Sequence, residues 1–546
     1  MKSSLPRRRL IPRWRPISLT LQTSEVDYTQ NKPSERLTFD HGLFEESVAA
    51  WQNNPTAGHL GDVIAFAGDA DLRPRVAGFV RTAQNKGWAV SSAQRDLFRD
   101  IQEESEENDD TTFEGQRVFQ SRVARLRREL IVAPTNVMAL LDLAQLQLAS
   151  GKAEAAKRYL KTALSLAPNG RIVLRTAARF FVHLGEYERA HALITRYPGS
   201  KQDPWLIASE IALADAAKKP STLVNVGRRL IKERFNSPAS LAELAGALAN
   251  KELFEGHLKE AREYLRQALR HPTDNIAAQA VVDAASMNVR LDEPEVLKAV
   301  QNSAEAQVLQ AWMRFEEGSA ESHALKWHAE EPFSSRPLQF LTSLQALQGE
   351  HVKALNWVKR GLIADPVDEG LLRNLAFHQA AVGDLKSADA TIRRVTPILS
   401  ARGDPFLIAT QGLIALRRFE FERGGVLYRE AEQSFKKTGQ HGLAALCMLH
   451  YAKFAKEAGD PLSDKLMMEA EAKVQKNPTI DALLLLSKMS KTPVPVPVEE
   501  DQQRRLSQWV FDPVANSLTQ RSEVTAKGAP SLVLTQPPNL PPLKAG

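Results

Sequence analysis

Residues 137–168 read VMALLDLAQLQLASGKAEAAKRYLKTALSLAP, and this stretch decides the fold. Two segments with a helical spacing of apolar residues flank Gly151, which supplies the turn between them. The small residues Ala144 and Ala156 let two antiparallel helices approach each other, while leucines fill the remaining space. The stretch therefore predicts a pair of closely packed helices.

The same helix pair recurs along the chain with a period of 34 residues. A fixed period of this kind is typical of repeat architectures, in which each unit packs on its neighbours. A chain of 546 residues also exceeds one hydrophobic core, which stops growing near roughly 250 to 300 residues. The recurring sets are Leu140, Gly151 and Ala156, then Leu174, Gly185 and Ala190, and later Leu338, Gly349 and Ala354, then Leu372, Gly383 and Ala388.

At these positions the chain resembles the tetratricopeptide repeat family, although Gln147 stands where the family pattern has an aromatic residue. The resemblance implies an all-α, right-handed superhelical solenoid of antiparallel helix pairs. Between residues 137 and 476 we expect about ten such pairs. The residues of the first unit that match the pattern are Leu140, Leu143, Ala144, Ala156, Leu160, Ala163 and Pro168.

Three Asp-Pro pairs predict helix starts, at Asp203, Asp404 and Asp460. An aspartate side chain accepts a hydrogen bond from the free backbone N–H groups of the first turn, and proline fits the first helical position. Each pair therefore marks the beginning of a helix inside the expected solenoid.

The chain divides into four expected parts. Residues 1–35 form a disordered basic arm, and residues 36–112 a small helical region of unassigned family that ends in an acidic linker. Residues 113–490 form the solenoid, and residues 491–546 a Pro-rich, mostly disordered tail. In this tail the apolar cluster Trp509, Val510 and Phe511 is consistent with either a spacer or a docking motif.

The positive charge of the chain is confined to its beginning. Residues 1–24 hold six of the 71 basic residues and none of the 65 acidic ones, so residues 25–546 hold 65 of each. The solenoid is therefore not expected to be a basic surface for nucleic acid. The arm itself allows nucleic-acid contact through phosphate binding and ring stacking, by Arg7, Arg8, Arg9, Arg13, Trp14 and Arg15.

The single cysteine, Cys447, excludes an internal disulfide and a multi-cysteine metal cluster. The sequence has no apolar stretch of membrane-spanning length and no signal peptide after its basic start. We therefore expect a cytoplasmic protein without membrane insertion.

The resemblance to tetratricopeptide repeats implies a binding groove lined by the first helix of each pair. Projected onto that face, the side chains are mildly basic, and Arg175, Arg179 and His183 follow one another at steps of four. Ordinary solvation of a helix surface explains the two arginines equally well. The later residues of the expected groove are Arg373, Asn374, Arg417 and Lys453.

Catalytic, metal and cofactor sites are not expected. The Ser434 and Lys437 spacing overlaps the Lys-Thr-Gly run that a penicillin-binding acyl enzyme needs on a separate strand. Cys447 and His450 share a helix face with apolar neighbours, which predicts a buried structural thiol. Asp69 and Asp71 lie in a turn, where paired carboxylates are usually solvated.

These observations predict a non-enzymatic scaffold or adaptor that binds a segment of a partner protein in its groove. The alternative is a nucleic-acid-associated accessory protein that uses the basic arm.

Overall fold

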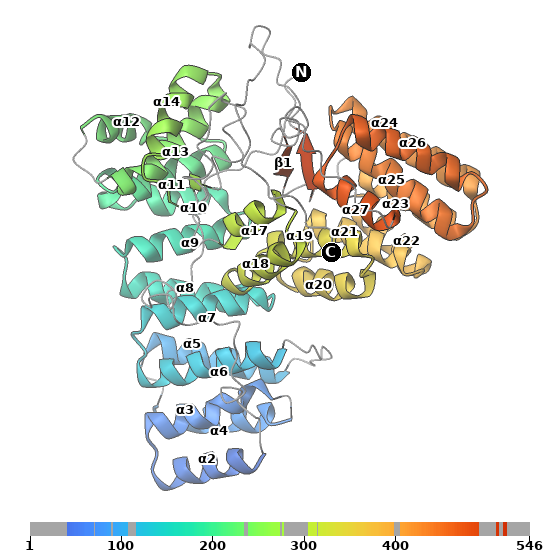
Figure 1. The fold of residues 1–546 in the computed structure, drawn as a ribbon. Coiled ribbons are helices and arrows are strands. Elements are labelled where there is room, and N and C mark those ends of the chain that lie inside the picture. The colour runs from blue at the N-terminus through green and yellow to red at the C-terminus, as the bar shows by residue number, and fades with distance from the viewer. Residues whose placement is uncertain are drawn as a thin grey trace. The chain divides into compact units, whose positions relative to one another are not determined.

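In the computed structural model nearly all described residues are helical, and the helices form antiparallel pairs (Figure 1). The contacts divide the chain into two compact units. Among the described residues, the N-terminal unit comprises 41–200 with 329–333, and the C-terminal unit comprises 201–328 and those from 334 onward. The structure describes residues 41–69, 71–88, 91–106, 116–233, 238–273, 276–277, 304–313, 315–397, 404–490, 509–512 and 517–520.

The N-terminal unit begins with short helices whose aromatic residues form its core. Trp51, Phe66 and Phe98 are buried, and Phe79 packs edge-on against Trp51. The elements are α2 (His41–Asn53), α3 (Ala57–Ala65), η2 (Phe66–Gly68), α4 (Arg73–Asn85), α5 (Ser92–Glu106), α6 (Gln116–Val132), α7 (Val137–Ala149), α8 (Ala153–Leu166), α9 (Arg171–His183) and α10 (Tyr187–Thr195), followed by the 3-10 turn η3 (Pro198–Lys201).

A buried ionic network joins α5 to the next helices of this unit. The Arg127 guanidinium donates to Asp100 at 3.2 Å and to Glu104 at 2.7 Å. Asp100 also accepts hydrogen bonds from Gln147 and from the hydroxyl of Tyr159. Residues 103–106 thus belong to α5 and Glu104 is buried, in contrast to the acidic linker expected there, whereas residues 107–112 lie outside the described parts.

The C-terminal unit continues the series of helix pairs and carries two strands near the end of the chain. Its elements are α11 (Pro204–Ala216), α12 (Val224–Glu233), α13 (Pro238–Glu255), α14 (Leu258–Ala268), α17 (Ala304–Met313), α18 (Glu317–Glu330), α19 (Ser335–Gln348), α20 (His351–Ala364), α21 (Glu369–Ala381), α22 (Leu385–Val395), α23 (Pro405–Arg417), α24 (Phe421–Lys437), α25 (His441–Ala458), α26 (Ser463–Lys476), α27 (Ile480–Ser490), β1 (Trp509–Asp512) and β2 (Ser517–Gln520).

The 34-residue period corresponds to the observed helix pairs, so the all-α repeat fold is confirmed. The four turn glycines have left-handed backbone angles, with φ of 75° at Gly151, 73° at Gly185, 78° at Gly349 and 89° at Gly383. Only glycine adopts this region without strain. The leucines and alanines of the repeating sets, for example Leu140 and its equivalents, are all buried.

The predicted helix starts are present in the structure. Asp203 accepts from the backbone N–H of Trp205, and Asp404 accepts from the N–H groups of Phe406 and its successor. Asp460 accepts from the N–H of Leu462, but regular helix begins only at Ser463. The third start is therefore a capped turn that leads into α26.

The strands β1 and β2 form an antiparallel hairpin that the sequence analysis did not anticipate. Trp509 pairs with Gln520 and Phe511 with Leu518, and β2 lies alongside α25 and α27. The remaining residues of 491–546 lie outside the described parts, so the predicted disorder of the tail stays a prediction.

Candidate functional site

Four successive first helices of the C-terminal unit, α19, α21, α23 and α25, form a continuous surface, which we call the first-helix face. Each packs against the second helix of its own pair, and adjacent first helices contact one another. Gly424 of α24 lies against Gly412 of α23, where an added Cβ at Gly424 would come within 3.2 Å of the Gly412 carbonyl oxygen. The absence of these side chains brings the two helices close together.

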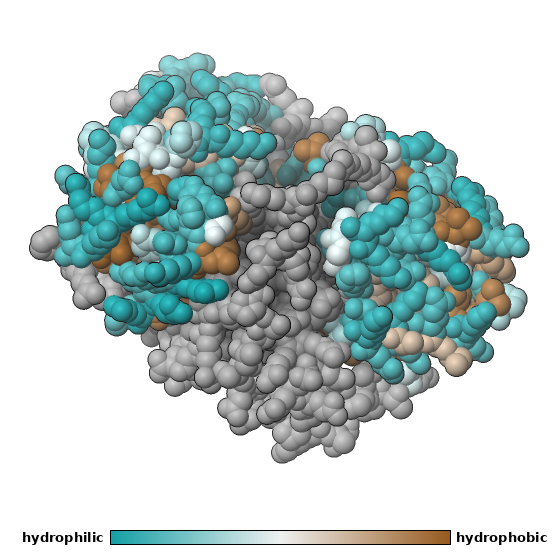
Figure 2. All heavy atoms as spheres, turned by 90° about the horizontal axis from the view of Figure 1, so that it is seen from above, coloured by the Kyte–Doolittle hydropathy of each residue, from teal (hydrophilic) through white to brown (hydrophobic). Residues whose placement is uncertain are grey.

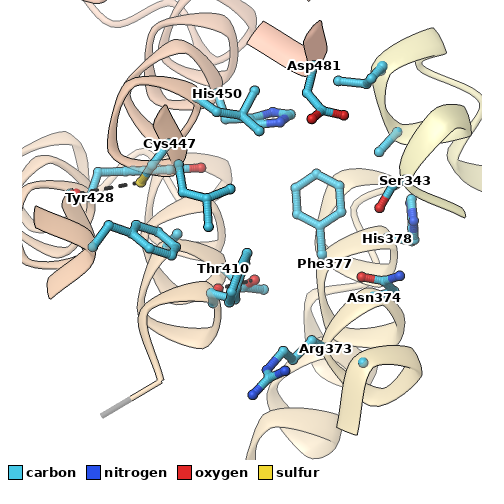
Figure 3. Close-up of a pocket in the computed structure, with 18 residues that line it drawn as sticks. Ser343, Arg373, Asn374, Phe377, His378, Thr410, Tyr428, Cys447, His450 and Asp481 are labelled. Carbon is cyan, nitrogen blue, oxygen red and sulfur yellow. Dashed lines mark hydrogen bonds between the residues drawn. The ribbon is translucent and has the colours of Figure 1, made fainter. Parts of the chain in front are cut away.

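A cavity of about 150 Å³ opens between these four helices and is also bordered by α24 and α27 (Figure 3). Most of its lining is apolar, and the ring of Phe377 projects into it. Its wall carries polar groups, among them those of Ser343, Asn374, His378 and His450. The remaining lining residues are Ala346, Leu347, Gly370, Arg373, Phe406, Ala409, Thr410, Tyr428, Phe435, Leu443, Leu446, Cys447 and Asp481.

Three histidines and two phenylalanines pack together beside this cavity. The Nδ1 atoms of His351 and His378 are 3.1 Å apart, so one of them donates a hydrogen bond to the other. The ring of Phe377 lies 5.7 Å from that of His450 and 6.0 Å from that of Phe454, both edge-on. His450 stacks on Phe454 with ring centroids 5.9 Å apart. These contacts fix the orientation of the cavity wall.

All three histidines are neutral at physiological pH. Burial, together with the positive charges of Lys453 and Arg417, lowers the pKa of His351 to about 4. Burial and the neighbouring His351 lower the pKa of His378 to about 3, and burial with Lys453 lowers that of His450 to about 3. A charged imidazole is disfavoured wherever water is excluded. The cavity therefore presents uncharged imidazole groups.

The cationic residues predicted for the later part of the groove lie on this face, but they are held by internal partners. Arg373 lines the cavity and pairs with Asp404 at 2.6 Å. Arg417 donates to the carbonyl oxygen of Ala381 and pairs with Glu457 at 2.8 Å. The remaining predicted residues are also engaged, since Asn374 donates to Thr342 and Lys453 lies 4.0 Å from Glu457.

The residues predicted for the earlier part of the groove belong to the N-terminal unit. Arg175 is buried, with 5% of its surface exposed. Arg179 lies 3.7 Å from Glu331 and over the ring of Phe333, and the His183 ring contacts the same phenylalanine edge-on. The structure thus places these three side chains on one helix and covers two of them with the segment 329–333. Whether they bind a partner stays a prediction.

The sequence candidates for catalysis are placed as packing and capping groups. Ser434 and Lys437 lie on the last turn of the single helix α24. Cys447 is buried, as expected, and burial raises the pKa of its thiol, which disfavours the thiolate. Asp69 accepts hydrogen bonds from the N–H groups of Asp71 and its successor at the turn before α4. Cys447 and His450 nevertheless share the wall of the cavity.

His351 and His378 were missed by the sequence analysis. They are 27 residues apart in the chain and meet only because α20 and α21 are adjacent. A usable signal existed, since His378 follows the predicted groove residue Asn374 by one helical turn. The residues of the basic arm, Arg7 to Arg15, lie outside the described parts of the chain.

The class that the fold defines is the all-helical repeat protein. Residues 147–208 match the tetratricopeptide repeat family. The predicted resemblance to this family is therefore confirmed for that part of the chain. No curated protein shows significant sequence similarity to it.

Solved structures with partial likeness are also helical. The Cut9–Hcn1 hetero-tetramer of the APC/C is 12% identical, with 87% of this chain and 98% of that chain covered at a TM-score of 0.32. The human IFIT1 dimer with m7Gppp-AAAA is 15% identical, with coverages of 62% and 89% and a TM-score of 0.30. Yeast Tom70 is 12% identical, with coverages of 83% and 99% and a TM-score of 0.28. These scores are too low for any property of those proteins to transfer to this chain.

Proposed function

We propose that this protein is a non-enzymatic interaction scaffold whose C-terminal unit holds a segment of a partner protein on the first-helix face. The observation that carries the proposal is the cavity between α19, α21, α23 and α25. A concave, largely apolar pocket with a few polar groups is the usual form of a site that anchors a ligand side chain.

A pocket that takes a single anchoring side chain needs no broad apolar surface around it. On the face drawn in Figure 2 the described surface is mainly hydrophilic, and hydrophobic residues form small separate patches. Large exposed apolar areas are the usual mark of flat interfaces. A concave pocket for one side chain gives specificity without such an area.

The state of the ionisable groups supports binding over catalysis. The pKa values of the cavity histidines His378 and His450 are lowered, so these side chains are not poised for proton transfer near neutral pH. The pKa of the Cys447 thiol is raised, so this thiol is not poised for nucleophilic attack. Arg373 is held in an ion pair with Asp404. These groups are suited to shaping a pocket.

The proposal places the protein in the cytoplasm, because its single cysteine gives no sign of an oxidising compartment. None of the helices in the described residues is both long and apolar enough to span a bilayer. Nucleic-acid binding by the arm stays an untested alternative.

Photocrosslinking tests the proposal. A diazirine analogue of leucine in place of Leu446, which lines the cavity, keeps the size of the native side chain and is expected to crosslink a partner segment. The same analogue in place of Leu462, which is exposed and lies outside the cavity lining, serves as the matched control. A segment captured from position 446 and not from position 462 supports binding at this face. Equal capture from both positions, or capture from neither, contradicts it.

A further inference from the structure

The size of the cavity on the first-helix face matches one aromatic ring. A volume of roughly 150 Å³ between apolar side chains accommodates a benzene molecule. The cavity has about this volume. An indole is larger than this space, and a small aliphatic side chain would leave part of it empty.

The walls of the cavity favour a ring over an aliphatic chain. Phe406 and Phe435 meet edge-on with ring centroids 5.0 Å apart, and both line the space together with Phe377 and Tyr428. Aromatic pairs prefer edge-to-face or offset packing, which an inserted ring can adopt against several of these side chains. The lining therefore offers a ring more favourable contacts than its area alone provides.

One polar atom of the cavity lining lacks a partner. The Nδ1 atom of His450 is buried and has no hydrogen bond within the described part of the chain. Such an atom is costly to leave unsatisfied. Because the ring is neutral, Nδ1 either donates or accepts according to the tautomer. A phenolic hydroxyl can both donate and accept, so it satisfies Nδ1 in either tautomer.

The charges around the cavity disfavour an ionised ligand. Both lining histidines are neutral, and Arg373 is engaged by Asp404. The acid that lines the cavity, Asp481, is buried. A carboxylate or ammonium group in this space would lose its hydration without a free counter-charge.

We infer that the cavity is a receptor for a tyrosine side chain of the partner segment, with its ring between Phe377 and Phe406 and its hydroxyl at His450. The inference rests on the proposed function and deepens it by naming the anchor. Tyrosine is a frequent anchor at interfaces because it combines a rigid apolar ring with a polar tip.

The test uses the full chain with p-cresol and toluene, which are the side-chain analogues of tyrosine and phenylalanine. Ligand-detected NMR titration is expected to show p-cresol binding about fivefold more tightly than toluene, in keeping with one net hydrogen bond. Ala409→Phe, which places a covalent ring in the cavity wall, should weaken the binding of both probes and so reports that they occupy the cavity.

Two variants locate the preference. His450→Phe keeps a ring that can stack on Phe454 and is expected to remove the p-cresol advantage while toluene still binds. His441→Phe, at the exposed start of the same helix, is the matched control and should retain the advantage. Even if a variant fails to fold, the comparison of p-cresol with toluene on the unaltered chain shows whether the cavity prefers a phenol to an aromatic ring without a hydroxyl.

Three results would overturn the inference. They are equal binding of the two probes, unchanged binding of both probes to the Ala409→Phe protein, or a gain in p-cresol affinity when Trp509 and Phe511 of the hairpin beside α25 are both changed to alanine. The last result would make the chain's own hairpin the occupant. None of these results decides the crosslinking test of the first-helix face. The tyrosine anchor can therefore fail while partner binding at this face still stands.

Discussion

Arg127 is the only cation among the described residues that contacts both buried carboxylates of the ionic network in the N-terminal unit, those of Asp100 and Glu104. Replacing Arg127 by methionine removes this cation. Arg127 is 1% exposed and bonds Asp100 and Glu104. Removing one partner of a buried ion pair usually costs about 3 to 5 kcal/mol, because the other charge stays buried and uncompensated. Here Asp100 keeps its hydrogen bonds from Gln147 and Tyr159, so we expect a loss near the lower limit, about 3 kcal/mol.

The effect of Arg127→Met should depend on pH. Burial and the nearby Glu104 raise the pKa of Asp100 to about 6, while Arg127 opposes the increase. Burial alone would raise the pKa of Glu104, but Arg127 and Lys152 lower it to about 2. Without Arg127 both folded-state pKa values increase, so the folded variant binds protons more readily than the folded parent. The destabilisation is therefore greatest near pH 7 and shrinks as the pH falls toward 5.

Hydrogen exchange of the amides in α5 to α8 measures this local stability directly. The matched control is Arg128→Met at the next position of α6, where the exposed ion pair with Asp62 should contribute no more than about 1 kcal/mol. Equal protection losses for the two variants, or a loss for Arg127→Met that grows on acidification, would refute the reasoning.

Two further predictions concern the C-terminal unit. Gly349→Ala should lower the free energy of unfolding by about 1 kcal/mol, because the turn requires φ of 78°. Gly318→Ala, in an exposed helical position with open space, should raise the free energy of unfolding slightly. Denaturant unfolding compares the two variants, and a loss of stability at Gly318 alone would contradict the turn argument. Because the pKa values of His351, His378 and His450 are lowered in the folded chain, the unfolded chain binds protons more readily than the folded chain does. Stability is therefore retained above pH 6.5 and is lost as the pH falls toward 4. Hydrogen exchange in α21 and α25 between pH 7 and pH 4.5 measures this loss, and unchanged protection would contradict the neutral state of the histidines.

The repeat could be predicted from sequence because its determinants are local. A turn glycine such as Gly151 and a small residue such as Ala156 act within one helix pair, and a 34-residue period exposes them. The helix starts at Asp203 and Asp404 were predictable for the same reason, since a cap bonds residues two or three positions away.

The cavity could not be predicted because its lining comes from six helices that are distributed over about 140 residues of the chain, from Ser343 to Asp481. Periodicity also does not separate an arginine on the surface from one in the interior. Arg127 and Arg175 are both buried, although the sequence pattern is equally compatible with solvated helix faces. Only packing against neighbouring helices decides which arginine meets water and which meets a carboxylate.

The measurement that tests the scaffold most directly is the affinity of the crosslinked partner segment for the full chain and for Ala409→Phe. This substitution places a covalent ring in the wall of a ring-sized cavity, while Ala364→Phe adds the same ring outside it. With folding of both variants verified by circular dichroism, we expect Ala409→Phe to weaken binding at least about tenfold, as the loss of a buried anchor does. Ala364→Phe should change the affinity less than about twofold, as expected for a surface position away from the site. Unchanged affinity of the Ala409→Phe protein would contradict binding at this face.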